Sequence, residues 1–282
     1  MNPMLSRILK ALSALVAVAL LSACGGASST VDPFRPTRVV GLGDGFNDAT
    51  ATVRVAGSTT GTVVGQVAAY FGQSNVESYA SSQARISNLS TQIDSVGSFS
   101  SGDLVVITAG AFDVKAGAVP ATEAQTLVTQ VQRLKTAGVK HILIMPVLDV
   151  SRTPWGRANT FDSAATNTFN TAVLTALSSA FGGESPNTVI YANASSVTSL
   201  FLTATSQATY SPFTDTGFNN TPAGTTPACG DPTVFTGCAA SVPTNAGRPY
   251  TTMLFANGIH LTPAGNRWVA SYLYNATAQG WR

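Results

Sequence analysis

Charged side chains are scarce in this chain of 282 residues: Asp, Glu, Lys and Arg together make up 10%, against roughly 25% in an average soluble protein. The chain therefore lacks the clustered Lys and Arg that nucleic-acid binding requires, and it is not composed like a disordered acidic tail. Basic side chains number 15 and acidic ones 13. Arg7 and Lys10 account for this excess, so the remainder is neutral and no electrostatic partner is implied, nucleic acid included.

Cysteine and histidine are also rare, with three and two copies. Cys24 lies near the N-terminus, whereas Cys229 and Cys238 lie close together in the last quarter of the chain. Neither of these two has a His or another Cys at metal-ligand spacing, so we predict no zinc site and no cofactor. In an exported protein, Cys229 and Cys238 would form a disulfide, worth roughly 2–3 kcal/mol in the chain-entropy model. Two free thiols are the alternative.

The one long hydrophobic run lies at the start of the chain. Residues 1–10 are short and basic, and residues 11–21 are apolar but too few to span a bilayer stably. Residues 1–23 therefore have the composition of an export signal. Cys24, directly after Leu-Ser-Ala, resembles the bacterial lipoprotein signal, which implies acylation of Cys24, and the following Gly25 implies the outer membrane. An ordinary signal peptide with an incidental Cys is the alternative.

Residues 24–36 are small and polar and indicate a tether. Acyl chains on Cys24 would then hold the protein at the bacterial cell envelope, with the membrane as its first partner.

The rest of the chain alternates between short buried strands and amphipathic helices. We predict strands at 37–43, 103–108, 141–146 and 188–191, and helices at 62–71, 121–137, 163–181 and 263–278. Repeated strand–helix units predict an α/β fold, a three-layer αβα sandwich with a mostly parallel sheet. Residues 37–282 form one predicted domain.

Residues 206–250 are an exception to this pattern. They are rich in Thr, Pro, Gly and Asn and contain Cys229 and Cys238. A stretch this long without regular structure is unusual in a compact domain. It is either a lid or binding loop stapled by the disulfide, or a tolerated surface insertion.

Three polar segments follow predicted strands or close the chain: 43–48, 109–113 and 257–263. Ligands of parallel α/β sheets gather at the carboxyl ends of the strands. The order and placement of these segments, with 78–84 as a further block, resemble the SGNH, or GDSL-type, hydrolase family of esterases and lipases. The resemblance extends from Arg38 through the final helix, and it implies a flavodoxin-like form of the three-layer sandwich.

The resemblance also shows where this chain departs from the family. The family's nucleophilic serine, directly after Gly-Asp, is Gly45 here. Its two further oxyanion donors, a glycine and an asparagine, correspond to Gln83 and Phe112. Its aspartate three residues before the histidine is Asn257, and only His260 is retained. Without a hydroxyl at residue 45 no acyl-enzyme forms by the family mechanism, so we predict that ester hydrolysis is lost.

Several side chains near these positions remain as candidates for a ligand pocket. Phe46 and Phe112 would either make the cleft apolar enough for an acyl or aromatic group, or fill it. Carboxylates together with His260 could bind a metal, but such Asp side chains more often cap helices and turns, so we predict no metal site. The predicted pocket residues are Asp44, Phe46, Asp48 and Asp113.

We therefore expect an envelope lipoprotein whose domain binds a ligand or a protein partner without hydrolysing esters. The alternative is an active ester hydrolase or acyltransferase in which a relocated serine acts with His260; the candidates by residue type are Ser81, Ser82 and Ser101. A third hypothesis is a membrane-tethered scaffold. His141 is predicted to be structural, and Trp155 either packs or lines a pocket.

Overall fold

A computed structural model of the chain describes residues 33–52, 58–184, 187–193, 227–230, 233–235 and 253–281. All elements given below belong to the unit Phe34–Arg282. The predicted signal segment, Cys24, Cys238 and most of 206–250 lie outside the described residues. Within the described part of the chain, no helix is long and apolar enough to cross a membrane.

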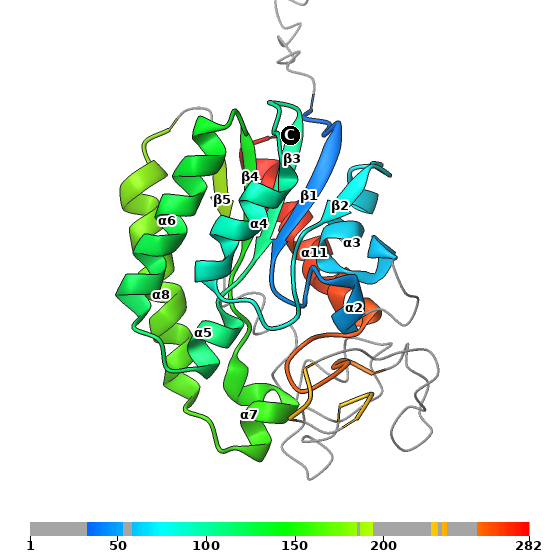
Figure 1. The fold of residues 1–282 in the computed structure, drawn as a ribbon, viewed down its shortest axis with the longest axis vertical. Coiled ribbons are helices and arrows are strands. Elements are labelled where there is room, and N and C mark those ends of the chain that lie inside the picture. The colour runs from blue at the N-terminus through cyan, green and yellow to red at the C-terminus, as the bar shows by residue number, and fades with distance from the viewer. Residues whose placement is uncertain are drawn as a thin grey trace, which may run out of the picture. The chain divides into compact units, whose positions relative to one another are not determined.

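Five parallel strands form one sheet in the order β2-β1-β3-β4-β5 (Figure 1). They are β1 (Arg38–Gly43), β2 (Val76–Ser78), β3 (Asp103–Thr108), β4 (His141–Met145) and β5 (Val189–Tyr191). Every residue of β3 is buried, as expected for a central strand whose two faces are both covered. This strand order is that of flavodoxin-like folds, so the predicted fold class is confirmed.

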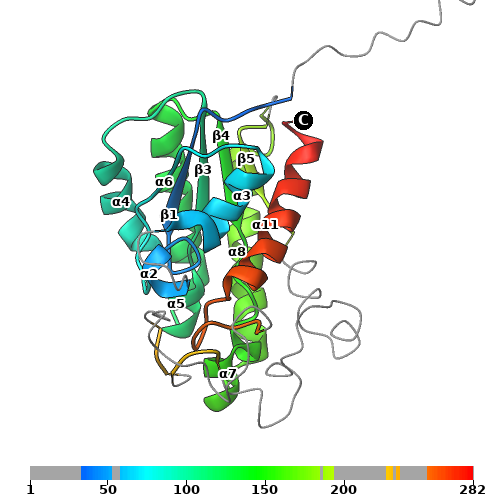
Figure 2. The same cartoon turned by 90° about the vertical axis from the view of Figure 1, so that its right-hand side faces the viewer.

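Helices cover both faces of the sheet. Figure 2 shows α4 and α6 on one side of the sheet and α3 and α11 on the other (Figure 2). α3 packs against α11, and α6 packs against α8. The α-helices among the described residues are α2 (Ala49–Thr52), α3 (Val63–Tyr70), α4 (Leu89–Val96), α5 (Ala111–Lys115), α6 (Pro120–Thr136), α7 (Pro154–Ala158), α8 (Ser163–Phe181) and α11 (Pro263–Ala276).

The predicted elements recur within about two residues of their expected bounds. The closing helix ends at Ala276 and continues as a 3-10 turn over Thr277–Gln279, instead of running to residue 278. It begins at Pro263 because the side chain of Thr262 accepts a hydrogen bond from the backbone N–H of Gly265. This cap fixes the direction of the segment that carries His260.

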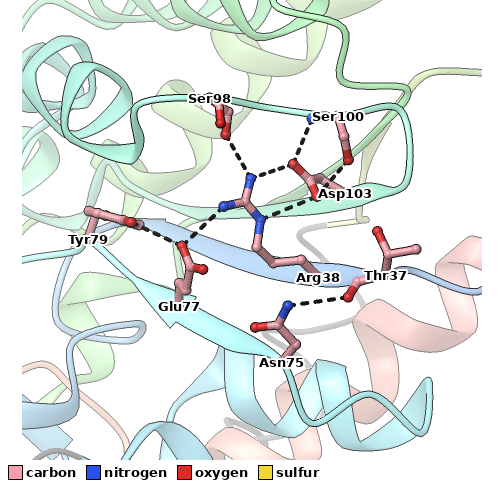
Figure 3. A network of polar contacts seen from close by, with 8 residues as sticks. All are labelled: Thr37, Arg38, Asn75, Glu77, Tyr79, Ser98, Ser100 and Asp103. Carbon is pink, nitrogen blue, oxygen red and sulfur yellow. Dashed lines mark hydrogen bonds and ion pairs between the residues drawn. The ribbon is translucent and has the colours of Figure 1, made fainter.

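The amino ends of three strands are joined by one guanidinium group (Figure 3). Arg38 on β1 pairs with Asp103 on β3 (Nη2 to Oδ2, 2.6 Å) and with Glu77 on β2 (Nη1 to Oε2, 3.3 Å). Asp103 is also held by Ser100, whose backbone N–H donates to Oδ2 over 2.9 Å. This network ties the three strands together at the edge of the sheet opposite the carboxyl ends, where ligands of parallel α/β sheets gather.

The other histidine, His141, starts β4 at this same amino edge. Its ring stacks on Phe34 with centroids 3.4 Å apart, and Trp281 meets it edge-on at 5.0 Å. The backbone N–H of Phe34 donates to the carbonyl of Trp281. Phe34, in the segment predicted as tether, thus packs on the domain. Burial lowers the pKa of His141 to about 4, and its place at this edge agrees with the structural role predicted for it.

Candidate functional site

A sharp turn after β1 brings residue 45 to the carboxyl edge of the sheet. Gly43 has φ +108°, and a Cβ there would lie 1.9 Å from the carbonyl oxygen of Thr108, so only glycine fits. The side chain of Gln92 holds Gly43 on both sides: it accepts from the Gly43 N–H over 2.6 Å and donates to its carbonyl over 2.9 Å. The turn that carries Asp44 and Gly45 is therefore firmly placed.

The imidazole of His260 lies directly against Gly45. A Cβ at residue 45 would be 2.4 Å from both Cε1 and Nε2 of His260 and 2.8 Å from Nδ1. His260 has no exposed surface. The structure thus brings the two predicted positions together, with the ring occupying the space that a side chain at residue 45 would need.

Two phenylalanine rings contact this imidazole, and a third packs on one of them. The Phe46 ring meets it edge-on with centroids 5.1 Å apart, and the Phe112 ring lies tilted at 5.6 Å. Phe235 packs edge-on against Phe112 at 5.3 Å. All three are buried. Of the two alternatives for Phe46 and Phe112, the structure favours rings that fill the site.

The His260 ring is placed poorly for moving a proton. Neither ring nitrogen makes a hydrogen bond of good geometry to the described residues, although the Phe235 backbone is near enough to act on the ring. Burial lowers the pKa of His260 to about 3, against a smaller opposing effect of the Phe235 backbone. The ring is therefore neutral near pH 7, and no described carboxylate orients it as the third member of a triad would.

Asn257 binds backbone instead of the imidazole. Its Oδ1 accepts from the N–H groups of Ile259 (3.1 Å) and His260 (2.9 Å). Its Nδ2 donates to the carbonyl of Phe235 over 3.3 Å. The side chain at the family's aspartate position thus ties the His260 segment to residue 235.

The positions of the oxyanion donors are also used differently here. The backbone N–H of Gly45, the donor that the nucleophile's own residue would supply, donates to the carbonyl of Ser82 over 3.2 Å. Gln83 is exposed. The Phe112 side chain carries no donor and packs in the aromatic cluster. The described residues therefore offer no assembled oxyanion hole at residue 45.

The three serines considered as relocated nucleophiles lie in different places. Ser82 is hydrogen-bonded to two residues of the site: its hydroxyl donates to the carbonyl of Phe235, and its carbonyl accepts from the N–H of Gly45. Ser81 is exposed, with its N–H on the carbonyl of Gly43. Ser101 is exposed and precedes β3, at the opposite edge of the sheet.

The carboxylates predicted to line a ligand pocket are buried and bonded to backbone. Asp44 Oδ1 accepts from the N–H of Phe46 over 3.3 Å, and Asp113 Oδ2 accepts from the N–H of Ile86 over 3.1 Å. Burial raises the pKa of Asp44 to about 8, with a further contribution from Asp113, whose own pKa burial raises to about 6.

Asp48 caps the start of α2: its Oδ1 accepts from the N–H and the hydroxyl of Thr50, each over 2.8 Å. Within the described residues, no three His, Cys, Asp or Glu side chains gather as metal ligands would. A pocket role for Asp44, Phe46, Asp48 and Asp113 stays a prediction.

Two residues that sequence reasoning did not assign to the site, Phe235 and Lys115, lie beside it. Lys115 Nζ lies 4.9 Å from the ring centroid of Trp155 and 5.0 Å from that of Phe235, within cation–π range of both. The backbone N–H of Trp155 donates to the carbonyl of Gly258 over 2.9 Å. Trp155 thus packs beside the His260 segment. Phe235 comes from a stretch without periodic pattern, so no sequence signal marked it.

Segment 227–235 contains one of the predicted disulfide cysteines. The backbone N–H of Cys229 donates to the carbonyl of Ala256 over 2.9 Å, and the N–H of Gly258 donates to the carbonyl of Val234 over 3.0 Å. Cys229 is buried. Because Cys238 lies outside the described residues, its pairing with Cys229 stays a prediction.

The fold is similar to those of several solved structures. The chain's structure is similar to that of a putative GDSL-like lipase from Parabacteroides merdae, with a TM-score of 0.52 and 12% identity over 87% of this chain and 97% of that one. A lipase/acylhydrolase from Enterococcus faecalis gives a TM-score of 0.48 and 12% identity over 87% and 97% of the two chains. An acetyl xylan esterase gives a TM-score of 0.48 and 14% identity over 85% of this chain and 98% of that one.

Identities this low support the fold alone. Comparison with curated proteins by sequence gave no match. A family model does match: the GDSL-like lipase/acylhydrolase model aligns with residues 14–273, which is most of the chain. This protein therefore belongs to the GDSL-like lipase/acylhydrolase family.

Proposed function

We propose that this protein is a lipid-anchored envelope member of its family that does not hydrolyse esters by the family mechanism and that acts by binding. The observation that carries the proposal is the position of His260, whose ring fills the space at Gly45. A catalytic histidine must reach both a nucleophile and water or a leaving group. Here the ring faces a glycine that has no nucleophilic group, and it does not reach water because it has no exposed surface.

The surrounding contacts support the same conclusion at separate steps of the reaction. No side-chain oxygen at residue 45 can form an acyl-enzyme. The Gly45 N–H is bonded to Ser82, so it is not available to a tetrahedral oxyanion. Asn257 is engaged with the backbone and does not stabilise an imidazolium.

Ester turnover tests the proposal directly. The purified full chain is assayed on short and medium nitrophenyl esters beside His260→Ala. We expect equal rates in the two proteins, because the imidazole takes no part in chemistry. A wild-type rate clearly above that of His260→Ala would overturn the proposal.

One contact favours a second candidate function, an ester hydrolase or acyltransferase that uses Ser82. The Ser82 hydroxyl and Asn257 Nδ2 donate to the same carbonyl, that of Phe235, beside His260. A rotation of the hydroxyl away from this carbonyl would be needed for attack. Labelling with a fluorophosphonate probe tests it: the second function requires labelling that Ser82→Ala abolishes and Ser101→Ala leaves unchanged.

The membrane anchor is a separate part of the proposal and rests on residues 1–36 of the sequence. We expect the mature protein to partition into detergent with the membrane fraction and to carry acyl chains on Cys24. Cys24→Ser should move it to the aqueous fraction. Retention of Cys24→Ser in the membrane fraction would contradict lipid anchoring.

The predicted disulfide between Cys229 and Cys238 would hold segment 227–235, and with it Phe235, beside the His260 segment. Alkylation of the denatured, unreduced protein followed by mass measurement tests the pairing. We expect no alkyl group on either cysteine before reduction and one on each after reduction. Alkylation of both without reduction would contradict it.

Whether the bound partner is a protein or a small molecule is a further choice within the proposal. A scaffold role predicts that an envelope protein co-purifies from detergent-solubilised membranes in a fixed ratio. A ligand-binding role predicts none.

A further inference from the structure

A pocket of about 290 Å³ lies where α8 meets the end of β5. Four of its lining residues, Asn167, Asn170, Thr171 and Leu174, are spaced three or four apart on α8 and so share one face of the helix. Tyr191 and Asn193, at and just after the end of β5, line the other side. None of these residues belongs to the His260 site.

The floor of the pocket is held rigidly by Asn170. Its Nδ2 donates to the carbonyl of Val147 over 2.8 Å, and its Oδ1 accepts from the Val147 N–H over 3.0 Å. The hydroxyl of Tyr191 donates to the same Oδ1 over 2.9 Å. This bonding joins α8, β5 and the segment after β4, so a ligand would meet a floor that is already in place.

The rim of the pocket has polar groups that are free to bind. Asn167 and Thr171 are exposed, lie one helical turn apart, and make no side-chain hydrogen bond to the described residues. Leu174, half exposed, continues the same face one turn further along. The rim therefore offers an amide that both donates and accepts, a hydroxyl, and an adjacent apolar surface.

Among the described residues that line the pocket, none carries a charged side chain. This lining therefore lacks the Arg or Lys that would pair with a phosphate or carboxylate, and the Asp or Glu that would pair with a cation. Amides, a hydroxyl and an aromatic ring together suit a neutral ligand with many hydroxyl groups and one less polar face. The volume of about 290 Å³ is just below the range of roughly 300–1,000 Å³ for ligand pockets, which suits a small ligand such as one or two sugar rings.

We propose that the pocket between α8 and β5 binds a neutral saccharide, with Asn167 and Thr171 bonding its hydroxyl groups. This inference goes beyond the proposed function and does not depend on it, because the pocket shares no residue with the His260 site. Ester turnover and saccharide binding can therefore fail or succeed separately.

Titration of the full chain with neutral oligosaccharides tests the inference. The probes are a trimer of N-acetylglucosamine and a trimer of glucose, with a trimer of galacturonic acid as the charged comparison, followed by calorimetry or by NMR of the saccharide. We expect saturable binding of at least one neutral trimer. Asn167→Ala and Thr171→Ala should each weaken it roughly threefold to tenfold, the loss that follows from one hydrogen bond.

Thr168→Ala is the matched control, because Thr168 is exposed on the same helix and does not line the pocket. All three changes raise helix propensity, so the variants should fold. The inference is overturned if neither neutral trimer binds at tens of millimolar, if the charged trimer binds more tightly, or if Thr168→Ala weakens binding as much as Asn167→Ala.

Discussion

The His260 ring and the Cα of Gly45 are in such close contact that no side chain fits between them. A Cβ on residue 45 would lie 2.4 Å from two ring atoms of His260. The absence of a nucleophile and the sealed position of the histidine are therefore one structural feature, because the ring can lie there only while residue 45 is glycine.

This contact predicts that Gly45→Ala destabilises the protein through the ring of His260. We expect a cost of roughly 1–3 kcal/mol, as for other overpacked cores. In a His260→Ala background the same change should cost much less, because the obstructing ring is gone. Urea unfolding of the two single variants and the double variant gives the coupling between the residues. Additive effects would show that the ring is not what excludes a side chain at residue 45.

Restoring the serine should not restore activity. Gly45→Ser meets the same ring atoms, the oxyanion position at 112 is still a phenylalanine, and Asn257 still binds backbone. We expect no ester turnover above that of wild type, and a loss of stability similar to that of Gly45→Ala. Turnover by Gly45→Ser that His260→Ala removes would mean that the ring moves readily into a catalytic position.

The sheet was predictable from sequence because its central strands are continuous apolar runs. α4 was not predicted, although Leu89, Ile93 and Val96 are buried at helical spacing. The fourth buried position is Gln92, whose amide makes two hydrogen bonds to the backbone of Gly43. This polar side chain interrupts the apolar pattern of the helix. β2 escaped prediction because it is a three-residue edge strand.

The site was predictable only in part. The order of three motifs along the chain indicated Gly45, Asn257 and His260. The contact between Gly45 and the ring, and the arrival of Phe235 from a stretch without periodicity, depend on tertiary packing that no local pattern encodes.

Asn257→Asp tests whether the amide is needed where relatives have a carboxylate. The new carboxylate would keep the bonds from the N–H groups of Ile259 and His260 but would place an oxygen against the carbonyl of Phe235. We expect a loss of roughly 1–3 kcal/mol, larger at pH 8 than near pH 4, where the introduced acid can be protonated. Unfolding free energies at the two pH values check this. Equal stability of the variant and wild type at pH 8 would contradict it.

Acid should destabilise the protein through its two buried histidines. Burial lowers the pKa of His260 from 6.5 to about 3 and that of His141 from 6.5 to about 4. Between pH 6.5 and these lowered pKa values, the unfolded chain binds protons that the folded chain does not bind. The stability that the neutral histidines contribute is therefore complete above pH 6.5 and is lost as the pH falls. Replacing His260 with Leu should reduce the loss of stability between pH 6.5 and about 4. An unchanged pH profile in His260→Leu would show that the ring is protonated in the folded state.

Asp44 predicts the opposite slope, because burial raises its pKa from 3.8 to about 8. The folded protein then holds a proton that the unfolded chain releases above pH 3.8. The stability from this group is therefore complete below pH 3.8 and is lost as the pH rises to about 8. Asp44→Asn keeps an oxygen for the N–H of Phe46 but carries no charge at any pH. We expect its unfolding free energy to fall less than that of wild type between pH 4 and 8.

Part of the wild-type pH dependence should remain in Asp44→Asn, because burial also raises the pKa of the neighbouring Asp113, to about 6. Asp44→Asn combined with Asp113→Asn should remove that part too. Parallel pH profiles for wild type and Asp44→Asn would mean that Asp44 is ionised in the folded protein.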